Sequence, residues 1–140
     1  MENVENTVDL DLDMYLVLSP ERSVRVPARL GYSSSDPFAV HMVFHVGSDF
    51  PVRWVFAREL LDEGVRRPCG YGDVRIWPTR VRDREVICLA LSSPDGNALL
   101  EADREEVRRW IRLTHHILPP GEEQRALALD AGLARLLADQ

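Results

Sequence analysis

The chain has 140 residues, 45% of them hydrophobic, and a net charge of −6 at pH 7. This length and composition predict one domain, residues 1–140, with residues 1–7 flexible. The acidic balance argues against tight nonspecific nucleic-acid binding. No apolar run approaches the roughly 20 residues that a membrane-spanning helix needs. The acidic segment Met1–Asn6 is unlike a secretory signal, so we expect a cytoplasmic protein.

The first part of the chain predicts four strands. Apolar and polar residues alternate over Val8–Leu18, Val24–Tyr32, Phe38–Val46 and Val52–Phe56. Alternation with a period of two is typical of strands that have one buried and one solvated face, and this favours antiparallel pairing.

A short helix is predicted next, over Ala57–Glu63, because Gly64 suits the end of a helix. Such a short helix is not stable alone, so it must pack on the sheet. Three further strands are predicted near Val74–Trp77, Glu85–Ser92 and Ala98–Glu101. The middle one of these three is apolar on both faces, so we expect it to be central and the most buried.

The last third of the chain changes to helical spacing. One amphipathic helix is predicted after Asp103, which can cap it, and it ends before Pro119. A second helix is predicted at the C-terminus, with Asp130 as its cap and leucines along one side. The order of four strands, a helix, three or four further strands and two helices, about 7–8 strands in all, predicts an α+β fold.

The sequence contains no legible pattern of residues typical of a catalytic site. His41 and His45 lie roughly 13 Å apart along a strand, too far to chelate one metal ion. No serine or cysteine stands in a legible nucleophile–base pattern, and the lone Gly-Tyr-Gly has no helix after it. Cys69 and Cys88 are typical of reduced, structural thiols. We predict no catalysis, no metal site and no cofactor.

Two kinds of binding remain open. One is single-stranded nucleic acid, with aromatic stacking groups beside arginines; the alternative for these aromatics is an ordinary place in the core. The candidate residues are Arg53, Trp54, Arg66, Arg67, Arg75 and Trp77. The other is protein interaction or self-assembly through the arginine-rich helix, the Pro119–Glu123 connector or the terminal leucines.

Several blocks of the sequence resemble a known family. These blocks are VRWVFARELLDEG, RPCGYGDVRIWPTR, VICLALSSPDGNALLEA and LPPGEEQ. In this order they are similar to the SsgA-like (SALP) proteins of sporulating actinomycetes, and most of all to the SsgB branch. The similarity runs from about Val8 to the C-terminus, so the chain is expected to be one SsgA-like domain.

The resemblance implies a regulator of sporulation-specific cell division that is not an enzyme. Such a protein marks septum sites and recruits the tubulin-like GTPase FtsZ, together with an SsgA-type paralogue. The implied fold is Whirly-like, with two antiparallel sheets in a barrel-like arrangement, and the implied assembly is a homo-oligomer, a trimer. The Whirly likeness keeps single-stranded nucleic-acid binding as the alternative. The family offers no catalytic residues, so the candidate partner surface is Arg109, Glu122 and Glu123.

Overall fold

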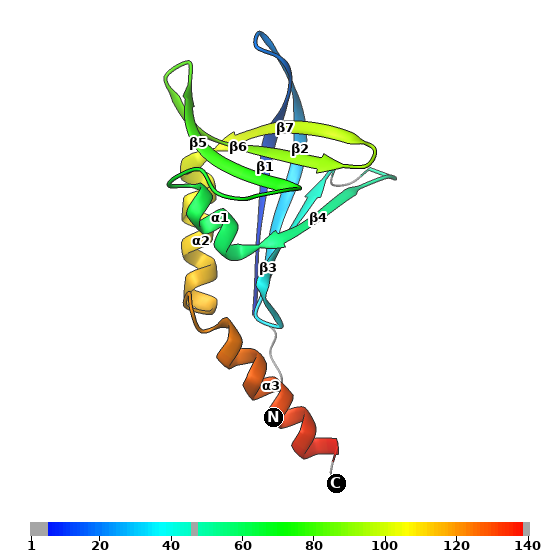
Figure 1. Ribbon diagram of the computed structural model, residues 1–140, viewed down its shortest axis with the longest axis vertical. Coiled ribbons are helices and arrows are strands. Elements are labelled where there is room, and N and C mark those ends of the chain that lie inside the picture. The colour runs from blue at the N-terminus through cyan, green and yellow to red at the C-terminus, as the bar shows by residue number, and fades with distance from the viewer. Residues whose placement is uncertain (1–5, 46–47, 139–140) are drawn as a thin grey trace.

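The computed structural model describes residues 6–45 and 48–138, and its elements follow the predicted order. Figure 1 shows the strands gathered at one end and α3 extending from the other. The elements are β1 Thr7–Ser19, β2 Arg22–Ser33, β3 Asp36–Phe44, β4 Val52–Ala57, α1 Arg58–Gly64, β5 Val74–Val81, β6 Arg84–Ser93, β7 Gly96–Asp103, α2 Arg104–Ile117 and α3 Glu123–Ala138. The α+β class is confirmed.

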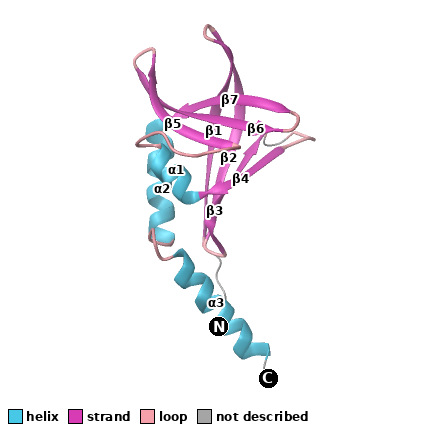
Figure 2. Cartoon of the chain, in the orientation of Figure 1, coloured by secondary structure: helices cyan, strands magenta, loops and turns pink. Residues whose placement is uncertain are grey.

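The seven strands of the described residues belong to one antiparallel sheet in the order β4-β3-β2-β1-β7-β6-β5. The two sheets expected from the resemblance are therefore joined halves of a single sheet. The joint is short, since β1 and β7 pair only at Tyr15 with Glu101 and at Leu16 with Leu100. By contrast, β1 pairs with β2 along nearly its whole length. The sheet curls, and Figure 2 shows the two halves crossing each other. The likeness to Whirly proteins stays a prediction.

The inner face of the curled sheet carries the core. Alternate residues of each strand point inward and pack on α1 and α2, so the period-two pattern of the sequence is realised in the fold. Met14, Leu30, Met42 and Ile76 are all almost fully buried there. Helix α2 contributes Trp110, whose indole N–H donates to the Val8 carbonyl oxygen at 3.3 Å and so ties α2 to β1.

The outer face of β1 and β2 is solvated and paired by charge. Arg29 bonds to Asp11 at 2.6 Å, and Arg25 bonds to Asp13 at 3.3 Å. Because both pairs are exposed, each adds little to stability. The aspartates of β1 thus form the wet face of a strand, as the alternation predicted.

Three details differ from the sequence expectations or lie beyond them. Strand β6 is indeed heavily buried, but β1 is central, because β7 comes between β6 and the first half. Helix α3 begins at Glu123, so Asp130 lies inside it and is not its cap. Residues 1–5 of the expected flexible segment lie outside the described residues, whereas Thr7 already belongs to β1.

None of the helices in the described residues is long and apolar enough to cross a membrane. Apolar surface instead remains on α3, where Leu127, Leu129, Leu136 and Leu137 are exposed.

Candidate interaction surfaces

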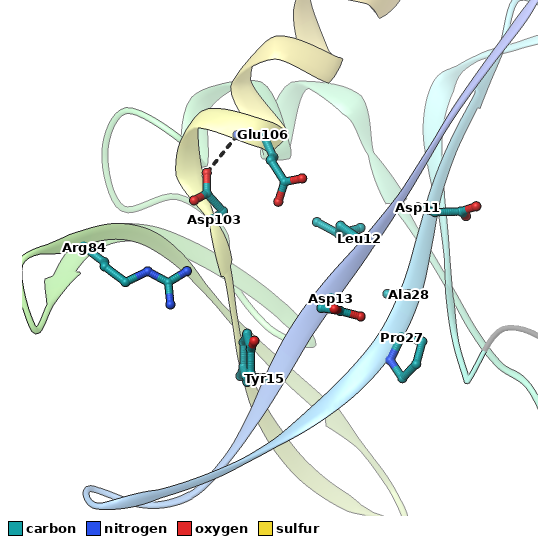
Figure 3. Close-up of a pocket in the computed structure, with 9 residues that line it drawn as sticks. All are labelled: Asp11, Leu12, Asp13, Tyr15, Pro27, Ala28, Arg84, Asp103 and Glu106. Atoms are coloured by element: carbon teal, nitrogen blue, oxygen red, sulfur yellow. Dashed lines mark hydrogen bonds between the residues drawn. The ribbon is translucent and has the colours of Figure 1, made fainter.

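An open cavity of about 580 Å³ lies where β1, β2, β6 and the start of α2 meet. Figure 3 shows Asp103, Glu106 and Arg84 on one side of it and Asp11 and Asp13 on the other. Three of these carboxylates, Asp11, Asp13 and Asp103, have partners within the fold. Asp103 accepts a hydrogen bond from the backbone N–H of Glu106 at 3.0 Å and thereby caps α2, as predicted from the sequence.

The acidic side chains Asp11 and Asp13 beside this cavity are each paired with an arginine. Asp11 is held by Arg29, whose hydrogen bond lowers the pKa of the Asp11 carboxyl. No group of three histidine, cysteine or acidic residues that could hold a metal ion occurs among residues 6–45 and 48–138. The cavity is an acidic, open surface.

A buried arginine, Arg58, lies at the C-terminal end of α2, away from the cavity at the start of that helix. Arg58 opens α1, and only 3% of its side chain is exposed. Its guanidinium donates to the carbonyl oxygens of Thr114 at 3.1 Å and Leu118 at 2.7 Å. Leu118 is the C-cap residue of α2, at a helix end where backbone acceptors lack helical partners. The Thr114 carbonyl oxygen, in the last turn, also accepts from the Leu118 N–H at 3.0 Å. Arg58 therefore closes the end of α2.

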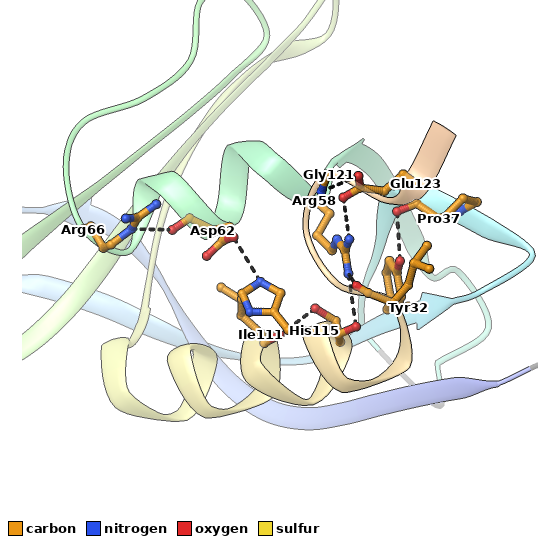
Figure 4. A network of polar contacts seen from close by, with 11 residues as sticks. Tyr32, Pro37, Arg58, Asp62, Arg66, Ile111, His115, Gly121 and Glu123 are labelled. Atoms are coloured by element: carbon orange, nitrogen blue, oxygen red, sulfur yellow. Dashed lines mark hydrogen bonds and ion pairs between the residues drawn. The ribbon is translucent and has the colours of Figure 1, made fainter. Parts of the chain in front are cut away.

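The same guanidinium binds the first residue of α3. Arg58 Nη2 donates to Glu123 Oε1 at 2.5 Å, while Glu123 Oε2 accepts from the Gly121 backbone N–H at 2.9 Å (Figure 4). Burial alone would raise the pKa of Glu123, but the hydrogen bonds from Arg58 and the backbone outweigh it and lower that pKa. A carboxylate in the first turn also suits the helix dipole.

Tyr32 completes this cluster from the sheet. The Arg58 guanidinium carbon lies 4.6 Å from the centre of the Tyr32 ring, within cation–π range. The Tyr32 hydroxyl donates to the Pro37 carbonyl oxygen at 3.0 Å. Burial raises the pKa of Tyr32, although the nearby Arg58 charge opposes this. Four elements, β2, α1, α2 and α3, thus meet at Arg58.

A second polar contact joins the two core helices. His115 of α2 and Asp62 of α1 lie 3.0 Å apart through Nε2 and Oδ2, and both side chains are about one-quarter exposed. Asp62 also offers its backbone carbonyl oxygen to Arg66 at 3.3 Å (Figure 4). The histidine thus has a polar partner within the fold.

The three residues of the predicted partner surface have different surroundings. Arg109 is exposed on α2 and paired with Glu105 at 3.5 Å, one helical turn before it. Glu122 is exposed in the connector between α2 and α3. Glu123, only 15% exposed, uses its carboxylate to bind Arg58. Arg109 and Glu122 are thus surface groups, and Glu123 is a structural one.

The six residues of the nucleic-acid alternative are not brought onto one surface. Trp54 packs on the core from β4, whereas Arg53 points to the opposite face of that strand. Trp77 and Arg75 lie on β5, at the other end of the strand order. Two arginines follow α1 and already have partners: Arg66 bonds to the Asp62 carbonyl oxygen, and Arg67 to Glu63.

Sequence reasoning missed Arg58, the residue with the most structural partners in this region. It lies within the predicted short helix, where an arginine usually faces solvent. Its position at the junction of an apolar strand and a helix was the one feature of the sequence that could have indicated its burial.

The comparisons with known proteins agree on one family. The family model "Streptomyces sporulation and cell division protein, SsgA" matches residues 26–123. The sporulation-specific cell division protein SsgB of Streptomyces coelicolor is 48% identical over 97% of this chain and 99% of its own. SsgB of Thermobifida fusca is 37% identical over 99% of this chain and all of its own.

Solved structures extend the likeness to the fold. A structure described as "Mutations in SsgB correlate to longitudinal cell division during sporulation of Streptomyces coelicolor" has a TM-score of 0.86 at 48% identity, covering 90% of this chain and 99% of its own. The crystal structure of an SsgA-like sporulation-specific cell division protein from Thermobifida fusca has a TM-score of 0.85 at 37% identity, covering 96% of this chain and 98% of its own.

The chain therefore belongs to the SsgA family of sporulation and cell division proteins. This confirms the resemblance read from the sequence blocks, including the likeness to the SsgB branch.

Proposed function

We propose that this protein is a non-enzymatic regulator of sporulation-specific cell division that works in the cytoplasm at the division septum. There it recruits the tubulin-like GTPase FtsZ, acts with an SsgA-type paralogue and assembles as a homo-oligomer, a trimer. The observation that carries the proposal is the nearly full-length similarity to SsgB proteins, which are named for sporulation-specific cell division.

The arrangement of the surface supports a scaffold. Among the α3 side chains that the structure describes, four leucines are exposed, and exposed apolar surface of this kind is typical of protein–protein contacts. The cluster around Arg58 fixes where α3 begins. We assign FtsZ contact to the polar surface that includes Arg109 and Glu122, and self-assembly to the leucines of α3.

Co-sedimentation with polymerised FtsZ tests the proposal directly. The purified protein should pellet with FtsZ polymers in a saturable manner at micromolar concentrations. The charge reversals Arg109→Glu and Glu122→Arg should lower the pelleted fraction without changing the fold, because both side chains are exposed. Arg75→Glu, an exposed arginine on β5, is the matched control and should pellet like the wild type.

The possible outcomes separate direct from indirect recruitment. If the protein stays in the supernatant with FtsZ alone, direct recruitment is wrong. If it pellets only after an SsgA-type paralogue is added, recruitment goes through that partner. The oligomer is tested separately by light scattering, where a mass near the 15.9 kDa of one chain would contradict assembly.

A further inference from the structure

The two edge strands of the sheet are protected very differently. On β5, Cys69 pairs with Ile76 through two backbone hydrogen bonds of 2.8 and 2.9 Å, and Pro78 interrupts the edge two residues later. A proline has no N–H to offer, so such residues guard an edge against further strands. The free side of β5 is thus partly covered and partly blocked.

Along Val52–Ala57, the opposite edge strand β4 has no such protection among the residues that the structure describes, and Pro51 directly precedes it. It pairs with β3 on one side and is the last strand in the order, as its boundary position in Figure 1 shows. Its sequence, Val-Arg-Trp-Val-Phe-Ala, holds no proline and one charge. Val52 and Val55 are 46% and 55% exposed. Half of the backbone N–H and C=O groups of an edge strand point away from its neighbour, where a further strand can bind them.

Cavities adjoin β4 on both faces of the sheet. On the inner face an apolar cleft of about 320 Å³ extends from Val52 and Trp54 to Phe44 and Leu91. On the outer face a second groove of about 320 Å³ has Arg53 at β4. Its other lining residues are Asp9, Arg29, Gly31, His41, Val43 and Pro51. A strand added beside β4 would place alternate side chains toward each of these spaces.

The charged residues on the outer face indicate which side chains an added strand would carry there. Arg29 is bound by Asp11, and His41 is bound by Asp36 at 2.9 Å. Arg53 makes no ion pair or side-chain hydrogen bond within the part of the chain that the structure describes. An acidic residue directly opposite Arg53 on an added strand would pair with it.

We propose that β4 is the docking edge for an extended segment of a partner protein. The segment adds to the sheet as an eighth strand, with apolar side chains directed to the cleft beside Trp54 and an acidic side chain directed to Arg53. This surface is separate from Arg109 and Glu122, and the proposal does not depend on FtsZ as the partner.

A designed peptide is the probe for this edge. The peptide is an acetylated and amidated octamer in which valine or leucine alternates with glutamate, labelled for fluorescence polarisation. We expect saturable binding and slower amide hydrogen exchange within residues 52–57. The same peptide with alternate backbone nitrogens methylated should bind at least tenfold more weakly, because it cannot form the ladder of hydrogen bonds.

A charge swap tests the acidic position. Arg53→Glu should weaken the glutamate peptide about fivefold and strengthen, by a similar factor, a peptide with arginine in place of glutamate. Arg75→Glu on the guarded edge β5 is the matched control and should change neither affinity. Both side chains are exposed, so the variants should melt like the wild type.

Several outcomes would overturn the proposal. These are no binding at millimolar peptide, equal binding of the N-methylated peptide, or protection that maps to other elements. A change in the light-scattering mass of the free protein on Arg53→Glu would show that a second copy occupies β4 instead. FtsZ is absent from this assay, so a failure here leaves the co-sedimentation result untouched.

Discussion

Replacing Glu123 with alanine removes the carboxylate that neutralises the buried Arg58. The guanidinium keeps its bonds to the Thr114 and Leu118 carbonyl oxygens but loses its only ion-pair partner among the described residues. An unpaired charge that stays buried is costly, because water cannot replace the lost carboxylate. The side chain of Arg58 is 3% exposed, so this condition holds here.

The expected loss is about 3 kcal/mol in the free energy of unfolding, at the lower end for a broken buried pair. This end of the range applies because the two carbonyl contacts remain and Glu123 is itself 15% exposed. For a chain of this size the loss corresponds to a fall of roughly 10 °C in Tm. The start of α3 should also loosen, since Glu123 holds its first turn.

Urea unfolding and thermal melting of Glu123→Ala measure the loss, with Glu122→Ala as the matched control. Glu122 is the adjacent acidic residue and is exposed, so its replacement should stay within about 0.5 kcal/mol of the wild type. Equal stability of the two variants would refute the structural role given to Glu123.

The pH dependence supplies a second check with a definite sign. The pKa of Glu123 is lowered in the folded protein, so its contribution is fully present above the unfolded pKa, about 4.3. That contribution is lost as the pH falls through the lower, folded pKa. The difference in unfolding free energy between wild type and Glu123→Ala should therefore shrink below about pH 4. A difference that stays constant down to pH 3 would contradict the ion pair.

Three further outcomes follow from the packing and charge. Gly64→Ala places a Cβ 2.5 Å from Ile76 Cγ2 and should cost about 1–3 kcal/mol, whereas Gly132→Ala on α3 meets nothing within 4 Å and should cost nothing in urea unfolding. Burial raises the pKa of Cys88 to about 11, so at pH 8 mass spectrometry should find this thiol unalkylated by iodoacetamide until the protein is denatured. Labelled single-stranded DNA should cause no saturable change in tryptophan emission at two salt concentrations; binding that falls steeply with salt would favour the nucleic-acid alternative.

Much of the fold was predictable because local pattern and burial coincide. Each of the first four strands has one solvated face, so the alternation of apolar and polar residues predicted them. The capping residue Asp103 predicted the start of α2. The start of α3 was missed because Glu123 is fixed by Arg58 of α1, a contact between residues far apart in the chain. Local spacing carries no information about such a partner.

The candidate surfaces were less predictable for the same reason. The sequence alone does not distinguish an exposed arginine, such as Arg53, from a buried one, such as Arg58. The joining of the two sheet halves was also hidden, since it rests on two residue pairs between β1 and β7. Resemblance identified the family of the chain. Only the three-dimensional structure shows which charged side chains are buried in ion pairs and which are exposed.

The short joint between β1 and β7 gives α2 a task beyond filling the core. Helix α2 packs on β1 from one half of the sheet and on β6 and β7 from the other. It therefore holds the two halves together where only two residue pairs join β1 to β7. The cleft beside β4 is bounded by both halves, with Trp54 on one side and Leu91 on the other. We therefore expect a change in the packing of α2 to alter the width of that cleft.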